Sequence, residues 1–173
     1  MSSSQVRNLV VVLGDQLDVD GASFDGFDAG LDAVLMSEVH EEATYVPQHR
    51  QRLVLFFSAM RHLRGTLEAR GYRVLYGALD DRSNTGTLTG ELERRLKAMQ
   101  PARLVVAEPG DFRVLHALRS SASRLAVDLE VRVDRHFLDT IEQFKTYASG
   151  RKELLLERYY RDLRRRHGVL MRN

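Results

Sequence analysis

An uninterrupted apolar run near the N-terminus constrains the fold more strongly than any other stretch. Residues 9–13 read LVVVL, and β-branched valine packs well on a pleated surface. Because no polar residue alternates with the apolar ones, the run is typical of a strand covered on both faces at the centre of a parallel sheet. It stops at Gly14, which permits a sharp turn, and the polar side chains of Asp15 and Gln16 follow. Ligands of open α/β sheets bind beyond the carboxyl ends of central strands, so we predict a binding crevice at this turn.

Further strands recur along the chain, and helices separate most of them. The helical segments carry apolar residues at spacings of three and four, which gives each of them one apolar face. Strands that alternate with helices form βαβ units, so the sequence predicts an α/β fold with a doubly wound five-stranded parallel sheet. The predicted strands are residues 9–13, 33–37, 73–79, 103–107 and 128–133, and the predicted helices are residues 49–70, 88–99, 112–125 and 151–167.

The connecting segments are predicted to be loops. Residues 18–32 are rich in aspartate and glycine, but their spacing does not match a calcium-binding loop, so we expect a solvated acidic loop. Residues 40–48 are also predicted as a loop, because Pro47 disfavours a helical conformation at the preceding residue. Residues 137–148 should form a loop with one short helix. The alternating pattern of residues 128–133 indicates a strand at the edge of the sheet.

The composition excludes several kinds of site. The sequence has no cysteine, which excludes disulfides, thiolate nucleophiles and cysteine-ligated metal centres from its 173 residues. Neither the glycine-rich dinucleotide fingerprint nor the common phosphate-binding loop occurs, and the six histidines lack metal-ligand spacing. No stretch approaches the roughly 18 consecutive apolar residues of a membrane span. The N-terminal MSSSQVRN lacks the apolar core of a signal peptide, so a cytoplasmic location is expected.

The charges are distributed unevenly. Residues 1–48 contain nine acidic residues and one basic residue, whereas residues 151–173 contain eight basic and three acidic residues. A basic C-terminal helix indicates either a nucleic-acid neighbour or an acidic partner domain. The alternative is a solvated helix with internal ion pairs, of which Glu157–Arg161 has the favourable spacing and order.

Seven separate stretches, in order, resemble one family. Together they cover almost the whole chain, and they are similar to the N-terminal domain of the deoxyribodipyrimidine photolyase-related proteins, which include iron–sulfur bacterial cryptochromes and prokaryotic (6-4) photolyases. The stretches are LGDQL at 13–17, EVHEEATYV at 38–46, HRQRLVLFFSAMRHLR at 49–64, LDDRSNTG at 79–86, EPGDFRV at 108–114, DRHFL at 134–138 and GRKELLLERYYRDLRRRHGVLM at 150–171.

The resemblance implies that two domains have separate functions. Residues 1–134 would form a Rossmann-like antenna domain that holds 6,7-dimethyl-8-ribityllumazine, and residues 135–173 a helical extension leading to a C-terminal domain absent from this sequence. In the family, that helical domain carries FAD, a 4Fe-4S cluster and the site for damaged DNA. Photolyases are carbon–carbon lyases whose repair requires an electron from reduced flavin, so this chain alone is not expected to catalyse repair.

The resemblance also points to individual site residues. Gly14 and Asp15 match the loop beside which the chromophore sits, and Glu42 matches an acidic residue that accepts hydrogen bonds from it. Phe56 stands where the family has an aliphatic residue, so its ring is expected either to stack on the chromophore or to fill its site. Four further cofactor-binding candidates lie at or just after the ends of predicted strands at the crevice: Gln16, Ser37, Glu38 and Glu108.

Three functions remain open from the sequence. The first is an antenna-binding module of a light-driven DNA repair enzyme. The second is a domain of a photosensory cryptochrome, which signals through partners and does not repair DNA. The third is a free-standing nucleotide-binding module of the same architecture. The sites that distinguish the first two would lie in the C-terminal domain, so residues 1–173 do not separate them.

Overall fold

The computed structural model of the chain describes residues 6–171 and divides into two compact units, which meet in the sequence between Arg132 and Val133. Most of the MSSSQVRN segment, on which the prediction of no signal peptide rests, lies outside the described residues. None of the helices described between residues 6 and 171 has the length and apolar content that a membrane crossing requires.

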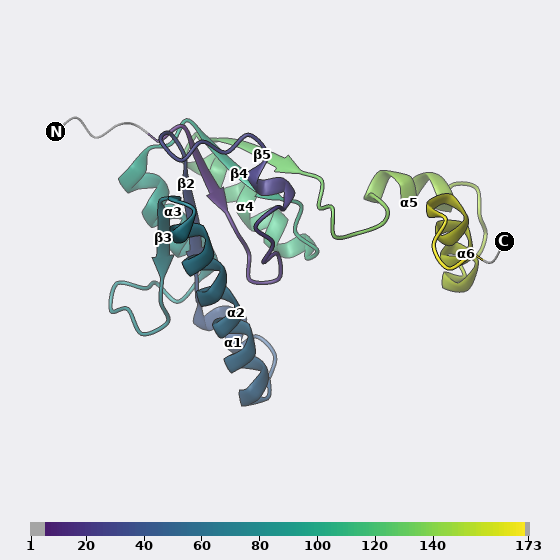
Figure 1. Cartoon of the computed structure of the whole chain (residues 1–173), viewed down its shortest axis with the longest axis horizontal. Helices are drawn as coiled ribbons and strands as arrows, with labels where there is room; N and C mark the ends of the chain where they lie inside the picture. The colour runs from purple at the N-terminus through teal and green to yellow at the C-terminus, as the bar shows by residue number, and fades with distance from the viewer. Residues whose placement is uncertain (1–5, 172–173) are drawn as a thin grey trace. The chain divides into compact units, whose positions relative to one another are not determined.

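A five-stranded parallel sheet forms the centre of the first unit (Figure 1). The strand order is β3-β2-β1-β4-β5, so the apolar run lies in the central strand and the alternating strand lies at an edge, as predicted. Both the parallel sheet and its doubly wound connections confirm the predicted α/β fold. The strands are β1 (Asn8–Val11), β2 (Ala33–Ser37), β3 (Val74–Gly77), β4 (Arg103–Ala107) and β5 (Asp128–Arg132).

Helices cover both faces of this sheet. On one face, α3 (Leu88–Met99) and α4 (Phe112–Arg124) pack their apolar side chains against Leu9 and Val11 of β1. On the other face, α2 (Arg50–Ala69) packs against Val10 and its neighbours. Because successive side chains of a strand point to opposite faces, a strand covered on both sides must be apolar throughout, and this requirement explains the unbroken LVVVL run.

One predicted loop contains a short helix. Residues 40–48 include α1 (His40–Thr44), so the prediction of a loop throughout this segment was wrong. Glu41 and Glu42 lie in the first turn of α1, where the helix dipole favours negative charge. Pro47 disfavours a helical conformation only at the residue before it, and α1 ends two residues earlier, at Thr44. A short helix is therefore compatible with Pro47.

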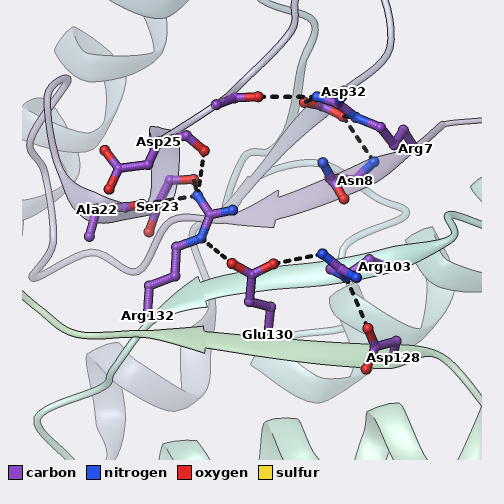
Figure 2. A network of polar contacts seen from close by, with 11 residues as sticks. Arg7, Asn8, Ala22, Ser23, Asp25, Asp32, Arg103, Asp128, Glu130 and Arg132 are labelled. Atoms are coloured by element: carbon purple, nitrogen blue, oxygen red, sulfur yellow. Dashed lines mark hydrogen bonds and ion pairs between the residues drawn. The ribbon is translucent and has the colours of Figure 1, made fainter.

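The acidic loop is anchored to the sheet and not simply solvated, which corrects the prediction for residues 18–32. The loop includes a short 3-10 helix, η1 (Ala22–Phe24), and Figure 2 shows Arg132 of β5 reaching it. Arg132 Nη1 donates to the carbonyl oxygens of Ala22 (3.1 Å), Ser23 (3.1 Å) and Asp25 (2.8 Å), while its Nε donates to Glu130 Oε1 at 2.7 Å. At the end of the loop, Arg7 pairs with the buried carboxylate of Asp32 at 2.6 Å.

Replacing Arg132 with alanine should lower the free energy of unfolding by about 1–2 kcal/mol, because three carbonyl oxygens lose a charged donor. Urea unfolding of the full chain, followed by circular dichroism, measures this change. Arg119→Ala on the exposed side of α4 is the matched control, and its effect should stay within about 0.5 kcal/mol. Equal effects in the two variants would show that water replaces the guanidinium without loss.

The second unit contains α5 (Ile141–Ala148) and α6 (Leu156–His167). Within it, Asp139 accepts hydrogen bonds from Tyr159 Oη (2.8 Å) and Arg166 Nη2 (2.8 Å). α6 begins five residues later than predicted, because Arg151 forms hydrogen bonds with the last turn of α5 and does not start α6. Its backbone N–H donates to the carbonyl oxygen of Ala148, and its Nε donates to that of Tyr147 at 2.6 Å.

Candidate functional site

A cavity of about 270 Å³ lies at the carboxyl ends of β1 and β2, where the predicted crevice should be. From β1 the chain adds β2 and then β3 toward one edge of the sheet. It then returns past β1 and adds β4 and β5 toward the other edge. The strand order therefore reverses next to β1, and such reversal points are where open α/β sheets bind their ligands.

The cavity has mainly apolar walls and a polar rim. This is the usual composition of a small-molecule site, in which apolar surface holds the ligand and a few polar groups orient it. The polar rim consists of Asp15, Glu42, Gln48, Arg52 and Asp111, and the hydroxyl of Ser37 is buried beside the cavity. The apolar walls include Val11, Leu13, Leu35, Val39, Leu53, Phe56, Phe57, Met60, Leu88 and Val114.

Phe56 and Gly14 form one wall together. A Cβ atom built on Gly14 would lie 2.2 Å from Cζ of Phe56, so the absence of a side chain at Gly14 is what allows the ring to approach. The Phe56 ring also meets Phe57 edge to face, with 5.8 Å between the ring centroids. Phe56 thus belongs both to the core that α2 forms with the sheet and to the lining of the cavity.

The structure brings five of the eight candidate residues to the cavity: Gly14, Asp15, Ser37, Glu42 and Phe56. The other three, Gln16, Glu38 and Glu108, are not among its lining residues. Gln16 is buried, and its Nε2 donates to the carbonyl oxygens of Ala107 (3.3 Å) and Glu108 (3.0 Å). Its side chain therefore joins the loop after β1 to the end of β4.

Glu38 is fully buried and is occupied by internal partners. Its carboxylate accepts hydrogen bonds from Arg61 Nε (2.6 Å), Arg61 Nη2 (2.9 Å), Tyr76 Oη (2.5 Å) and the backbone N–H of Leu79 (3.0 Å). Burial opposes the charged form, but these hydrogen bonds outweigh it and hold the pKa of Glu38 below its ordinary value. Glu38 thus fixes the ends of β2 and β3 beside the cavity.

α1 carries Glu42 to the rim, and backbone contacts hold α1 in place. The N–H of Glu41 donates to the carbonyl oxygen of Gly86 at 3.0 Å, and Gln48 Nε2 donates to the carbonyl oxygen of Glu42 at 3.2 Å. Burial raises the pKa of the Glu42 carboxyl, and the adjacent Glu41 raises this pKa further. The carboxylates of Asp15 and Asp111 add to the same shift in pKa, which indicates that the rim is rich in negative charge.

Several lining residues were not predicted as site residues. Gln48 precedes α2, Arg52 lies in the first turn of α2, and Asp111 caps the start of α4. Asp111 could have been found, because it follows β4 just as Asp15 follows β1. Gln48 and Arg52 carry no comparable signal, since only the packing of α2 on the sheet brings them to the strand ends.

The arrangement is suited to binding. Among residues 6–171, no group of three or more His, Asp and Glu side chains could hold a metal ion. The apolar walls suit a flat ring, and the carboxylates at the rim can accept hydrogen bonds from hydroxyl groups. The lining can therefore hold an apolar group and accept hydrogen bonds from hydroxyl groups beside it.

Comparison with known proteins gives the family. The chain is 41% identical over 166 residues to the (6-4) photolyase of Agrobacterium fabrum, an alignment that covers 96% of this chain and 33% of that relative. The chain thus spans about a third of the length of the curated relative it matches. Residues 10–173 match the family described as deoxyribodipyrimidine photo-lyase-related protein. Because that match covers nearly the whole sequence, the chain belongs to the family of deoxyribodipyrimidine photolyase-related proteins.

Proposed function

We propose that this chain is the antenna-chromophore-binding domain of a light-driven DNA repair photolyase of the (6-4) type. The cavity would bind 6,7-dimethyl-8-ribityllumazine. The observation that carries this proposal is an apolar cavity with a polar rim at the strand reversal of a chain that is similar, over 96% of its length, to a (6-4) photolyase. When bound, the lumazine would supply the absorption of light.

The residues of the cavity fit this ligand. The volume of the cavity, about 270 Å³, is close to the lower end of the range for small-molecule pockets, which begins at about 300 Å³. The Ser37 hydroxyl is buried beside the cavity without a hydrogen-bond partner in the described part of the chain. It can therefore form a hydrogen bond with a polar atom of the ring. Asp15 and Glu42 can accept hydrogen bonds from the ribityl hydroxyls.

The position of Phe56 favours one of its two predicted roles. The ring contacts Gly14, and yet a cavity of about 270 Å³ remains beside it. A ring that lines an open cavity can stack on a flat chromophore, whereas a ring that filled the site would leave no such space. We therefore propose that Phe56 stacks on the lumazine.

Repair would require further parts that this sequence does not contain. The chain has no cysteine to ligate an iron–sulfur cluster. We propose that FAD, the cluster and damaged DNA bind to a helical domain that continues the fold in the full-length protein, and that this domain is the partner of the present chain.

Titration of the purified chain with 6,7-dimethyl-8-ribityllumazine, followed by absorbance and fluorescence, tests the proposal. We expect saturable binding with a micromolar or lower Kd. In Glu42→Ala, binding should weaken by about 1–3 kcal/mol, because ligand hydroxyl groups lose their acceptor. Asp80→Ala is the matched control, since Asp80 is exposed and does not line the cavity.

Two outcomes would contradict the proposal. If the folded chain bound no lumazine, it would not be an antenna domain for this chromophore. If Glu42→Ala and Asp80→Ala bound equally well, Glu42 would have no role in the site. A full-length protein that bound lumazine but did not repair irradiated DNA in light would instead indicate a photoreceptor.

A further inference from the structure

Three helices begin at the wall of the cavity. Arg52 and Leu53 lie in the first turn of α2, Leu88 is the first residue of α3, and Asp111 and Val114 lie at the start of α4. In doubly wound folds, free N–H groups at such helix starts form the usual cradle for the phosphates of nucleotides. The occupancy of these N–H groups therefore indicates whether the cavity can accept a phosphate.

The chain's own side chains cap all three helix starts. The carboxylate of Asp111 accepts a hydrogen bond from the N–H of Arg113 at 2.8 Å, at the start of α4. At the start of α3, Thr87 Oγ1 accepts from the N–H of Gly90 at 3.1 Å, and Glu41 Oε2 accepts from that of Leu88 at 3.4 Å. At the start of α2, the side chain of His49 accepts from the N–H of Gln51 at 3.3 Å. These N–H groups are therefore not available to a phosphate.

The charges at the rim add to this effect. Asp15, Glu42 and Asp111 line the cavity with three carboxylates, against the single lining guanidinium of Arg52. The nearby Arg113 pairs with Asp111, and its guanidinium carbon lies 4.2 Å from the centroid of the Tyr45 ring. Arg113 thus offsets the charge of Asp111, and the carboxylates of Asp15 and Glu42 still outnumber the guanidinium of Arg52 at the rim.

We propose that Asp15, Glu42 and Asp111 make this cavity selective for an unphosphorylated ribityl heterocycle and cause it to reject the 5′-phosphate of the same compound. This inference rests on the proposed function and deepens it. A ribityl group is neutral and donates hydrogen bonds to carboxylates, whereas a phosphate carries about two negative charges and accepts only. The same argument disfavours nucleotides, whose phosphates would find carboxylates where the fold usually presents N–H groups.

The test compares two ligands that differ only in the phosphate. The full chain is titrated with 6,7-dimethyl-8-ribityllumazine and with its ribityl 5′-phosphate in the same low-salt buffer. We expect the phosphate to raise Kd at least about tenfold, because like charges in a confined site repel strongly. The ratio of the two Kd values should fall to about three or less in Asp15→Asn/Glu42→Gln, and also in the wild type as added salt screens the charges.

Asp80→Asn is the control for the removal of negative charge outside the cavity, and it should keep the wild-type ratio. Equal Kd values for the two ligands in the wild type would overturn this inference and leave the proposed function intact. A ratio that stayed unchanged in Asp15→Asn/Glu42→Gln would show that these carboxylates are not its cause. If neither ligand bound, the proposed function would fail, and the selectivity would fail with it.

Discussion

Replacing Glu38 with glutamine should lower the free energy of unfolding by about 2–4 kcal/mol at pH 7. The Glu38 carboxylate acts as the acceptor in its hydrogen bonds with Arg61, Tyr76 and the backbone N–H of Leu79. The amide group of glutamine would place a second set of donors against these groups and would remove the charge that pairs with Arg61. Arg61 is 55% exposed and can recover water, which keeps the expected loss below that of a fully buried pair.

The size of this effect should depend on pH. The folded-state pKa of Glu38 lies below its ordinary value of 4.5, so the charged side chain stabilises the fold fully above that pH. As the pH falls below 4.5 and through the folded-state pKa, protonation removes this contribution from the wild type. The difference in stability between the wild type and Glu38→Gln should therefore be large at pH 7 and shrink in acid.

Urea unfolding of both proteins at pH 7, 5 and 4 measures the difference. Glu68→Gln is the matched control, because Glu68 pairs with Arg64 on an exposed face of α2 at 3.6 Å. Such surface pairs contribute little, so the control should lose no more than about 0.5 kcal/mol. A Glu38→Gln variant as stable as the control at pH 7 would show that the buried carboxylate is not required for the fold.

Local patterns were sufficient to predict most of the fold. The apolar run of β1 predicted its central position, and Met60, Leu63 and Leu67 of α2 are buried, as their spacing indicated. The contacts that the patterns missed join distant segments. Arg132 donates to the carbonyl oxygen of Ala22, 110 positions earlier, and no local feature of either segment indicates that contact.

The site was predictable where strand ends determine it. Asp15 follows a strand whose unbroken apolar run predicts a central place in the sheet. Because open α/β sheets bind ligands beyond the ends of such strands, the position of Asp15 at the cavity was predictable. Glu42 and Phe56 were identified through the family resemblance. Glu38 also follows a strand, but its carboxylate turns toward Arg61 and away from the cavity lining. Sequence alone does not distinguish a charged residue that meets a ligand from one that meets a buried partner.

Gly14→Ala should weaken the binding of 6,7-dimethyl-8-ribityllumazine by about a hundredfold, or about 2.7 kcal/mol. The new methyl group would lie 2.2 Å from Cζ and 2.7 Å from Cε1 of Phe56, so the ring has to move. The ring packs against the core between α2 and the sheet, whereas the cavity offers free space. We therefore expect the ring to enter the cavity and occupy the place of the chromophore.

A second substitution separates this steric effect from a general loss of structure. Phe56→Leu removes the ring atoms that the new methyl group would meet, so Gly14→Ala/Phe56→Leu should bind lumazine far better than Gly14→Ala does. Phe56→Leu alone should weaken binding by less than about tenfold, because it loses only the stacking contribution. Circular dichroism and thermal unfolding of all three variants would confirm that they remain folded.

The interaction between the two substitutions is the informative quantity. Because Gly14 and Phe56 are in contact, their effects on binding should not add, and the double variant measures their coupling directly. Additive losses would mean that Gly14 contacts the chromophore itself and that the Phe56 ring does not control access to the cavity. Unchanged binding in Gly14→Ala would place the chromophore elsewhere on the chain, whatever the affinity of the wild type.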